Sequence, residues 1–185
     1  MRIRWTIPAV ALLALAVGAA AYLRYDTFGP GLSAAARNTA RFSAVIFAVA
    51  LAARSPRFAP LFARRGEAFW AFVAAHLVHY AYVLAVAVLD TSNPLHQMNP
   101  TNAGVFVGGF SLLAAAALTA GPASEPFRSR AHSVFFYGLG LSFAVALGMG
   151  TMRSAFSAVA LACVVLGFLV RVIPSRSSSA SAVPA

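Results

Sequence analysis

The sequence predicts an all-α protein, an integral membrane bundle of about six transmembrane helices. Of the 185 residues, 61% are hydrophobic and only 10% are charged, and the mean hydropathy is +0.79. A water-soluble domain of this length needs more charge on its surface than this chain carries. The apolar residues also fall into six runs separated by proline and arginine, and about 20 helical residues cross a bilayer core.

The first three runs are bounded by charged residues. The first run, 5–23, lies between Arg4 and Arg24, and we expect a signal anchor, although a cleaved secretory signal is the alternative. The second, 38–53, is short between its arginines, so we expect Arg41 to lie within the helix and to reach the interface or a buried partner. The third, 68–89, follows Arg64 and Arg65.

The last three runs are bounded by proline and arginine. The fourth, 103–120, lies between Pro100 and Pro122, the fifth, 132–150, between Arg130 and Arg153, and the sixth, 155–170, ends before Arg171. Proline interrupts helices, so its position between the runs supports their boundaries. The predicted transmembrane domain covers residues 1–174. The small polar residues 175–185 predict a disordered tail.

The charge of the chain is strongly positive, with a formal net charge of +10. The basic residues are all arginine and gather at the ends of the apolar runs, which indicates membrane topology and lipid contact and not nucleic-acid binding. If both termini are cytoplasmic, more of the arginines near the run ends lie on the cytoplasmic side than on the outer side. We therefore expect that orientation. Arginine without lysine suggests a GC-rich bacterial genome, hence the bacterial inner (cytoplasmic) membrane. Cys163 is the single cysteine, so no intrachain disulfide forms.

Histidines are the most informative polar residues of the apolar runs. His76 and His79 lie one helical turn apart within the third run, and His132 opens the fifth. Ionisable groups inside a membrane are costly and indicate a functional site, and imidazoles on two helices are the axial ligands of a low-spin haem. Two alternatives stay open: histidines that only bridge helices by hydrogen bonds, and a zinc, copper or nickel site. His96 is expected in a solvated loop.

A difference in depth argues against pairing these histidines on one iron. His79 lies about 18 Å along the helix from Glu67, whereas His132 lies about 3 Å from Arg130. The axial ligands of one haem must lie at a similar depth in the bilayer. His76 reduces the mismatch, and so does a fifth helix whose first turns are embedded in protein.

Three short motifs, in this order, resemble the ferric-reductase-like transmembrane domain, a family of membrane b-haem proteins. They are RNTAR at 37–41, PLFARR at 60–65 and HLVH at 76–79, and a histidine at 132 follows them. The family includes the haem-binding subunit of the periplasmic methionine sulfoxide reductase system. The resemblance covers roughly residues 37–150.

The resemblance implies a haem b site and the residues that hold it. His79 or His76 would be one axial ligand and His132 the other, while Arg41, Arg64 and Arg65 match basic positions that pair with haem propionates. Topology and headgroup binding are the alternative roles of these arginines. Two-haem members carry a further histidine on each of the two helices. Val145 stands at that position of the fifth run, so we expect one haem at most.

The resulting functional prediction is an electron-transfer component, the membrane subunit of a larger reductase. Electrons would come from a quinol, a flavin or a redox partner protein, since no flavin or nicotinamide motif is recognisable in the sequence. Whether the chain has an oxidoreductase activity of its own stays open. The alternative is a non-redox structural, assembly or transport accessory protein of the membrane whose histidines only bridge helices.

Overall fold

The computed structural model describes residues 5–92, 108–109, 111–112, 114, 125–151 and 154–172. These residues form helices and no strand, which confirms the all-helical class for the part described. The helices are α1 (Thr6–Tyr22), α2 (Phe28–Ala52), α3 (Ala59–Ala63), α4 (Arg65–Leu89), α6 (Glu125–Thr151) and α7 (Ala155–Val172). Most of the predicted fourth run, His96 and the predicted tail lie outside the described residues.

Three of the described helices are long and apolar enough to cross a membrane. They are Arg65–Leu89, the segment Arg130–Gly148 of α6, and Ala155–Val172, while Thr6–Tyr22 is apolar but shorter. Large apolar side chains also lie on the outer surface, among them Val134, Leu141 and Leu166. Exposed apolar surface on this scale fits a lipid environment, and these properties are those of an integral membrane protein.

Helix α2 begins ten residues before the predicted second run. The prediction started at residue 38, where the continuous apolar sequence begins, but the helix starts at Phe28. Pro30 lies in its first turn, where proline needs no hydrogen-bond donor. The added turns contain small residues such as Ala34 and Ala35, which are buried against neighbouring helices. A helix enclosed by protein does not need the unbroken apolar sequence of a lipid-facing one.

Two further boundaries differ from the prediction. The short helix α3, with Pro60 in its first turn, was not predicted. Helix α6 starts at Glu125, with Pro126 in its first turn, so His132 lies two turns inside the helix instead of at its start. Proline 30, 60 and 126 were expected between the runs, yet all three lie in first turns, where proline is tolerated. Helices α4 and α7 begin and end within three residues of the predicted runs.

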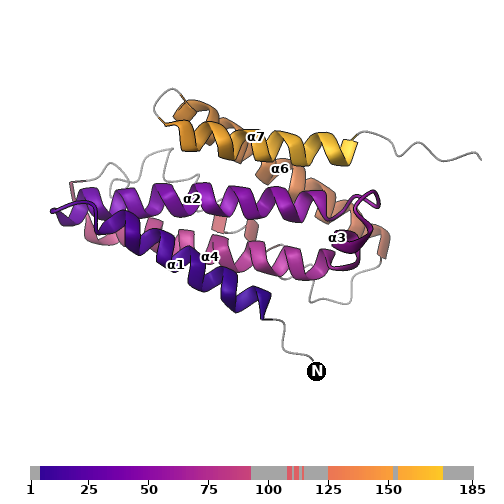
Figure 1. Ribbon diagram of the computed structural model, residues 1–185, viewed down its shortest axis with the longest axis horizontal. Coiled ribbons are helices and arrows are strands. Elements are labelled where there is room, and N and C mark those ends of the chain that lie inside the picture. Colours follow the sequence, from indigo (N-terminus) through magenta and orange to yellow (C-terminus); the bar gives the residue numbers. More distant parts are fainter. Residues whose placement is uncertain are drawn as a thin grey trace, which may run out of the picture.

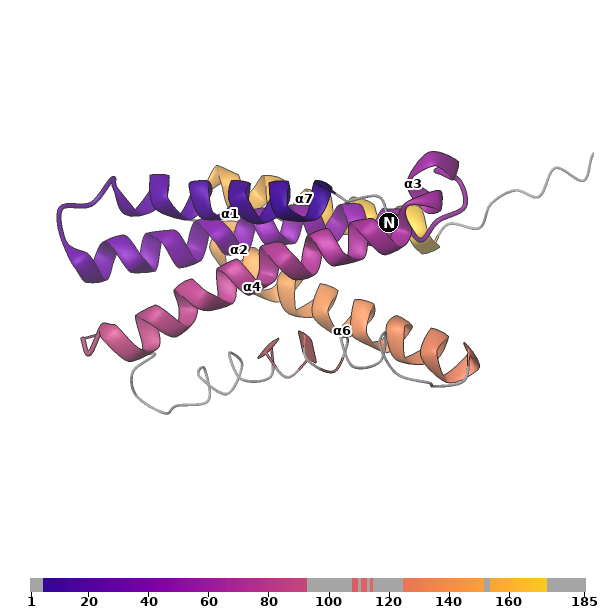
Figure 2. The same ribbon diagram turned by 90° about the horizontal axis from the view of Figure 1, so that it is seen from below.

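Helix α2 is the centre of the arrangement (Figure 1). It contacts α1, α4, α6 and α7, and α7 lies on the opposite side of it from α1 and α4. Helices α4 and α6 are inclined to one another (Figure 2). The core between α2, α4 and α6 is aromatic: the Phe47 ring centroid lies 5.2 Å from that of Phe72 and 5.6 Å from that of Phe136. All three rings are fully buried, so this core fixes the three helices relative to one another.

Candidate functional site

A cavity of about 420 Å³ lies between α2, α4, α6 and α7. Its volume is within the range of about 300–1,000 Å³ that is typical of small-molecule and cofactor sites. Most of the surface area that lines the cavity is apolar, and the polar side chains come mainly from α2 and α4. The lining residues are Arg37, Ala40, Arg41, His76, His79, Tyr80, Val83, Gly108, Leu139, Ser142, Phe143, Ala146, Leu147 and Ser157.

The His79 ring is held by a backbone carbonyl of α2. Its Nδ1 lies 3.1 Å from the carbonyl oxygen of Ala36 and 3.4 Å from Oγ1 of Thr39. A carbonyl oxygen only accepts hydrogen bonds, so Nδ1 of His79 carries the proton and donates it. Burial between the helices disfavours the charged ring, so the ring is neutral and Nε2 is its unprotonated nitrogen. His79 lines the cavity. A carbonyl that holds the second ring nitrogen in this way is characteristic of metal-ligating histidines.

His76 is held by the same face of α2, one turn further along. Its Nδ1 lies 3.0 Å from Oγ of the buried Ser43, a hydroxyl that either donates or accepts. The ring of His76 is buried and packs against Phe72 and Phe143, with centroid distances of 5.4 and 5.7 Å. The two imidazole centroids are 5.4 Å apart. Two imidazoles that share one face of α4 therefore line the same cavity, as the spacing of the HLVH motif predicts.

Arginine side chains line the cavity beside the histidines. Arg41 is half-buried within α2, as predicted, and meets polar partners there: its Nε donates to Ser157 Oγ at 2.9 Å and its Nη1 to Asn38 Oδ1 at 3.2 Å. Arg37, one turn earlier, also lines the cavity and is exposed. Neither guanidinium has a carboxylate partner among the residues that the structure describes. The cavity therefore combines neutral imidazoles with unpaired positive charge.

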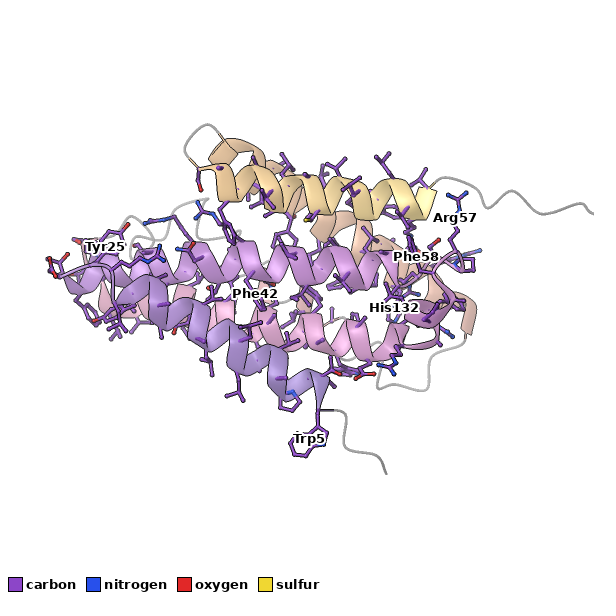
Figure 3. The ribbon with its side chains drawn as sticks, viewed as in Figure 1. Trp5, Tyr25, Phe42, Arg57, Phe58 and His132 are labelled. Atoms are coloured by element: carbon purple, nitrogen blue, oxygen red, sulfur yellow. The ribbon has the colours of Figure 1, made fainter. Side chains whose placement is uncertain are left out.

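His132 does not lie in this cavity. Its Nδ1 accepts a hydrogen bond from Nη1 of Arg54 at 3.2 Å, and its ring packs 5.6 Å from that of Phe69. Figure 3 labels it at the end of the molecule that carries Arg57 and Phe58, opposite Tyr25.

The axial distance between His132 and His76 is large on two helices. Arg54, which lies beside His132 just after the end of α2, follows Ser43 beside His76 by eleven residues, about 16 Å at the helical rise. On α6, His132 precedes Phe143 beside His76 by eleven residues as well. The structure therefore does not bring the expected axial pair together, and the depth difference noted in the sequence persists.

Arg64 and Arg65 also lie away from the cavity. Both are exposed at the start of α4, and Arg65 lies over the ring of Phe62, with its guanidinium carbon 4.4 Å from the centroid. Its Nη1 donates to the carbonyl oxygen of Phe62. Of the three arginines expected near haem propionates, only Arg41 lines the cavity.

Several polar residues of the site were not predicted from the sequence. Thr39 and Ser43 are fully buried in α2 and lie four residues apart, so they share the helix face that meets the two imidazoles. Arg37 was not predicted either, and it has the same spacing from the predicted Arg41. The sequence signal that would have identified Thr39 and Ser43 is a pair of hydroxyls at positions i and i+4 on a helix that packs against a histidine pair. Ser157, the partner of Arg41 on α7, has no such signal.

The arrangement can bind a planar or metal-containing group through nitrogen. Nε2 of His79 is a lone-pair donor whose direction α2 fixes, and the arginines provide hydrogen bonds to an anionic substituent. Among the described residues, no group of three or more histidine, cysteine or acidic side chains lies together. Comparison with protein-family models, with curated proteins and with solved structures finds no match to this chain.

Proposed function

We propose that this chain is an integral membrane protein of the bacterial cytoplasmic membrane that carries electrons through a b-type haem in the cavity between α2, α4, α6 and α7. It would act as the membrane subunit of a reductase and exchange electrons with a quinol or a redox partner protein. The observation that carries the proposal is the hydrogen bond from Nδ1 of His79 to the carbonyl of Ala36, because it leaves Nε2 unprotonated beside a cavity.

The residues of the cavity fit a haem on one side of its ring. A haem supplies four nitrogen ligands of its own, so the protein needs to add only one or two. His79 is the favoured ligand because its tautomer is fixed, while Ser43 leaves the tautomer of His76 open. Arg41 and Arg37 suit carboxylates at the cavity edge, and Phe143, Leu139 and Leu147 supply apolar contacts. When bound, the haem would supply one-electron oxidation and reduction.

The ligand set proposed from the structure differs from the one expected from the sequence. His132 lies about 16 Å along the helices from His76, and further from His79. We therefore propose ligation through the α4 histidines, and through His79 first, without His132. His76 and His79 project from one face of one helix, so they do not occupy opposite sides of the same iron.

The test is a reduced-minus-oxidised absorption spectrum of protein purified from cells with ample haem. We expect a Soret band in the wild type and in His132→Ala, and loss of the band in His79→Ala. His79→Gln is the sharper variant, because the glutamine amide retains a donor for the Ala36 carbonyl but provides no imidazole ligand.

The outcomes separate three ligand assignments. Loss of haem in His132→Ala, with His79→Gln unaffected, would support a different packing of α6 and contradict the proposed site. Loss of the Soret band in His76→Ala alone would assign the haem ligand to His76, one turn earlier on α4. A colourless wild type that is monodisperse would contradict the haem proposal altogether.

The second candidate is a non-redox membrane protein in which the histidines join helices. One observation favours it: both Nδ1 atoms already bond to α2, through Ser43 and through Ala36. Intramembrane hydrogen bonds of this kind contribute about 0.6 kcal/mol on average. Under this reading, His79→Gln leaves the stability nearly unchanged and the protein is colourless with or without added haem.

A further inference from the structure

Two arginines, one just after α2 and one in α7, lie beside the same aromatic ring, away from the cavity. Arg54 follows the end of α2, and its guanidinium carbon lies 5.1 Å from the ring centroid of Phe136. Arg171 lies in the last turn of α7, and its guanidinium carbon lies 5.9 Å from the same centroid. We call these two residues the arginine pair. Both are half-buried, so the pair is reachable from outside the helix bundle.

The positive charge of the arginine pair is not neutralised by the described part of the chain. Arg54 donates to the neutral nitrogen of His132, and Nη2 of Arg171 donates to Ser133 Oγ at 3.3 Å. Nη1 of Arg171 is buried and has no hydrogen-bond partner among the residues that the structure describes. Burial and the nearby charges of Arg171 and Arg65 lower the pKa of Arg54 from its ordinary value. Arginine remains protonated nonetheless, so like charges are held together without a counter-ion in the described residues.

A buried N–H without an acceptor and two like charges beside one ring are both unfavourable, and one anion would relieve both. The planar guanidinium matches the oxygens of a phosphate, which has enough acceptors for two arginines at once. The pair also lies at the end of the bundle where other arginines are exposed, among them Arg57, Arg64 and Arg65. Basic pockets between transmembrane helices near the cytoplasmic surface bind anionic lipid headgroups.

We propose that Arg54 and Arg171 bind the phosphate of an anionic phospholipid at this end of the bundle. The site joins α2 to α6 and α7 through a lipid headgroup. The inference rests on the proposed membrane insertion and not on the haem, so a colourless protein leaves it intact.

The test measures phospholipid binding to the purified full chain in detergent by native mass spectrometry. The probes are a short-chain phosphatidylglycerol, a phosphatidylcholine of equal chain length and inorganic phosphate. The variants are Arg54→Gln, Arg171→Gln and the double substitution. The matched control is Arg24→Gln, because Arg24 is an exposed arginine that follows α1 at the other end of α2.

We expect tighter binding of phosphatidylglycerol than of phosphatidylcholine by the wild type. Each single substitution lowers the affinity for phosphatidylglycerol about fivefold, the effect of one arginine near an anionic surface, while Arg24→Gln leaves it unchanged. Because both arginines hold one phosphate, the loss in the double variant is smaller than the product of the two single losses. Arg171→Lys keeps the charge, so it retains more affinity than Arg171→Gln and shows that misfolding is not the cause.

Three results would overturn the proposal. If Arg24→Gln lowers the affinity for phosphatidylglycerol as much as Arg54→Gln or Arg171→Gln does, the chain attracts lipid through its overall charge only. Inorganic phosphate that binds as tightly as phosphatidylglycerol, and is lost in the same variants, would make the ligand free phosphate. Unchanged phosphatidylglycerol binding in the double variant would leave the arginines as determinants of topology alone.

Discussion

Among the residues that the structure describes, Ser43 is the hydrogen-bond partner of a histidine ring that is almost fully enclosed. His76 is 6% exposed and Ser43 is fully buried, and their side chains are 3.0 Å apart. A polar atom that loses its partner in such surroundings has no water to replace it. The small hydroxyl of α2 therefore determines how well the imidazole is tolerated.

The Ser43→Ala substitution tests this role. It leaves Nδ1 of His76 without the serine oxygen, and we expect it to destabilise the protein by about 1–3 kcal/mol, the cost of one unsatisfied buried polar group. The measurement is the midpoint of thermal unfolding in detergent. The control is Ser142→Ala, because Ser142 is exposed and donates to the carbonyl of Gly138 in its own helix. Equal midpoints for the two variants would contradict the prediction.

At the scale of helices, α2 and α7 approach each other closely at Gly167. A Cβ atom built on this glycine would lie 3.0 Å from the carbonyl oxygen and 3.4 Å from the Cα of Ala48. Both atoms belong to the backbone, so no flexible side chain is available to move away. Gly167 thus sets the distance between α2 and α7.

The Gly167→Ala substitution should therefore separate these helices. We expect a loss of about 1–3 kcal/mol, typical of overpacking a tight interface, and a fall in the unfolding midpoint. The matched control is Gly138→Ala in α6, where a Cβ meets no atom within 4 Å. That change should be neutral or stabilising, because alanine favours helix over glycine by about 1 kcal/mol. A midpoint for Gly167→Ala at or above that of Gly138→Ala would show that the helices separate without cost.

The sequence predicted the bounds of α1, α4 and α7 to within three residues. Helices α4 and α7 coincide with apolar runs bounded by arginine, because a lipid-facing helix must be apolar along its whole length. Helix α2 was predicted too short, since protein covers the small residues of its first turns. The five-residue α3 has no periodic pattern long enough to recognise.

The candidate site was predicted in part, and the reason is geometric. His76 and His79 share a face because of their spacing on one helix, so sequence alone places them together. The position of His132 relative to them depends on where α6 begins and on how far α4 and α6 slide past each other. Neither quantity is encoded in a local pattern. The contact of Phe143 with His76, instead of His132 with His76, reveals the actual offset.

At the scale of the whole molecule, the arginines are distributed unequally between the two ends. Arg54 and Arg57 follow α2, Arg64 precedes α4 and Arg65 begins it, at the end where Figure 3 labels Phe58. Arg24 lies near Tyr25 at the opposite end. The excess of arginine in cytoplasmic loops predicts that the Phe58 end faces the cytoplasm.

Cysteine labelling tests this orientation. In a Cys163→Ala background, a cysteine introduced by Tyr25→Cys should react with a membrane-impermeant maleimide in intact spheroplasts. One introduced by Phe58→Cys should react only after the membrane is permeabilised, because both side chains are exposed and only their side of the membrane differs. The Cys163→Ala parent reports background labelling. The reverse pattern would invert the proposed topology, and labelling of both in intact spheroplasts would contradict membrane insertion of the bundle.

The hydrogen bonds between α2 and the two imidazoles have an entropic consequence for any ligand that binds in the cavity. A free histidine side chain samples several rotamers, and fixing one on binding costs about 0.5–1.5 kcal/mol. Here Ala36 and Ser43 restrict both rings before anything enters. The loss of conformational freedom is thus incurred when the helices pack, and a ligand finds both imidazole rings already preorganised.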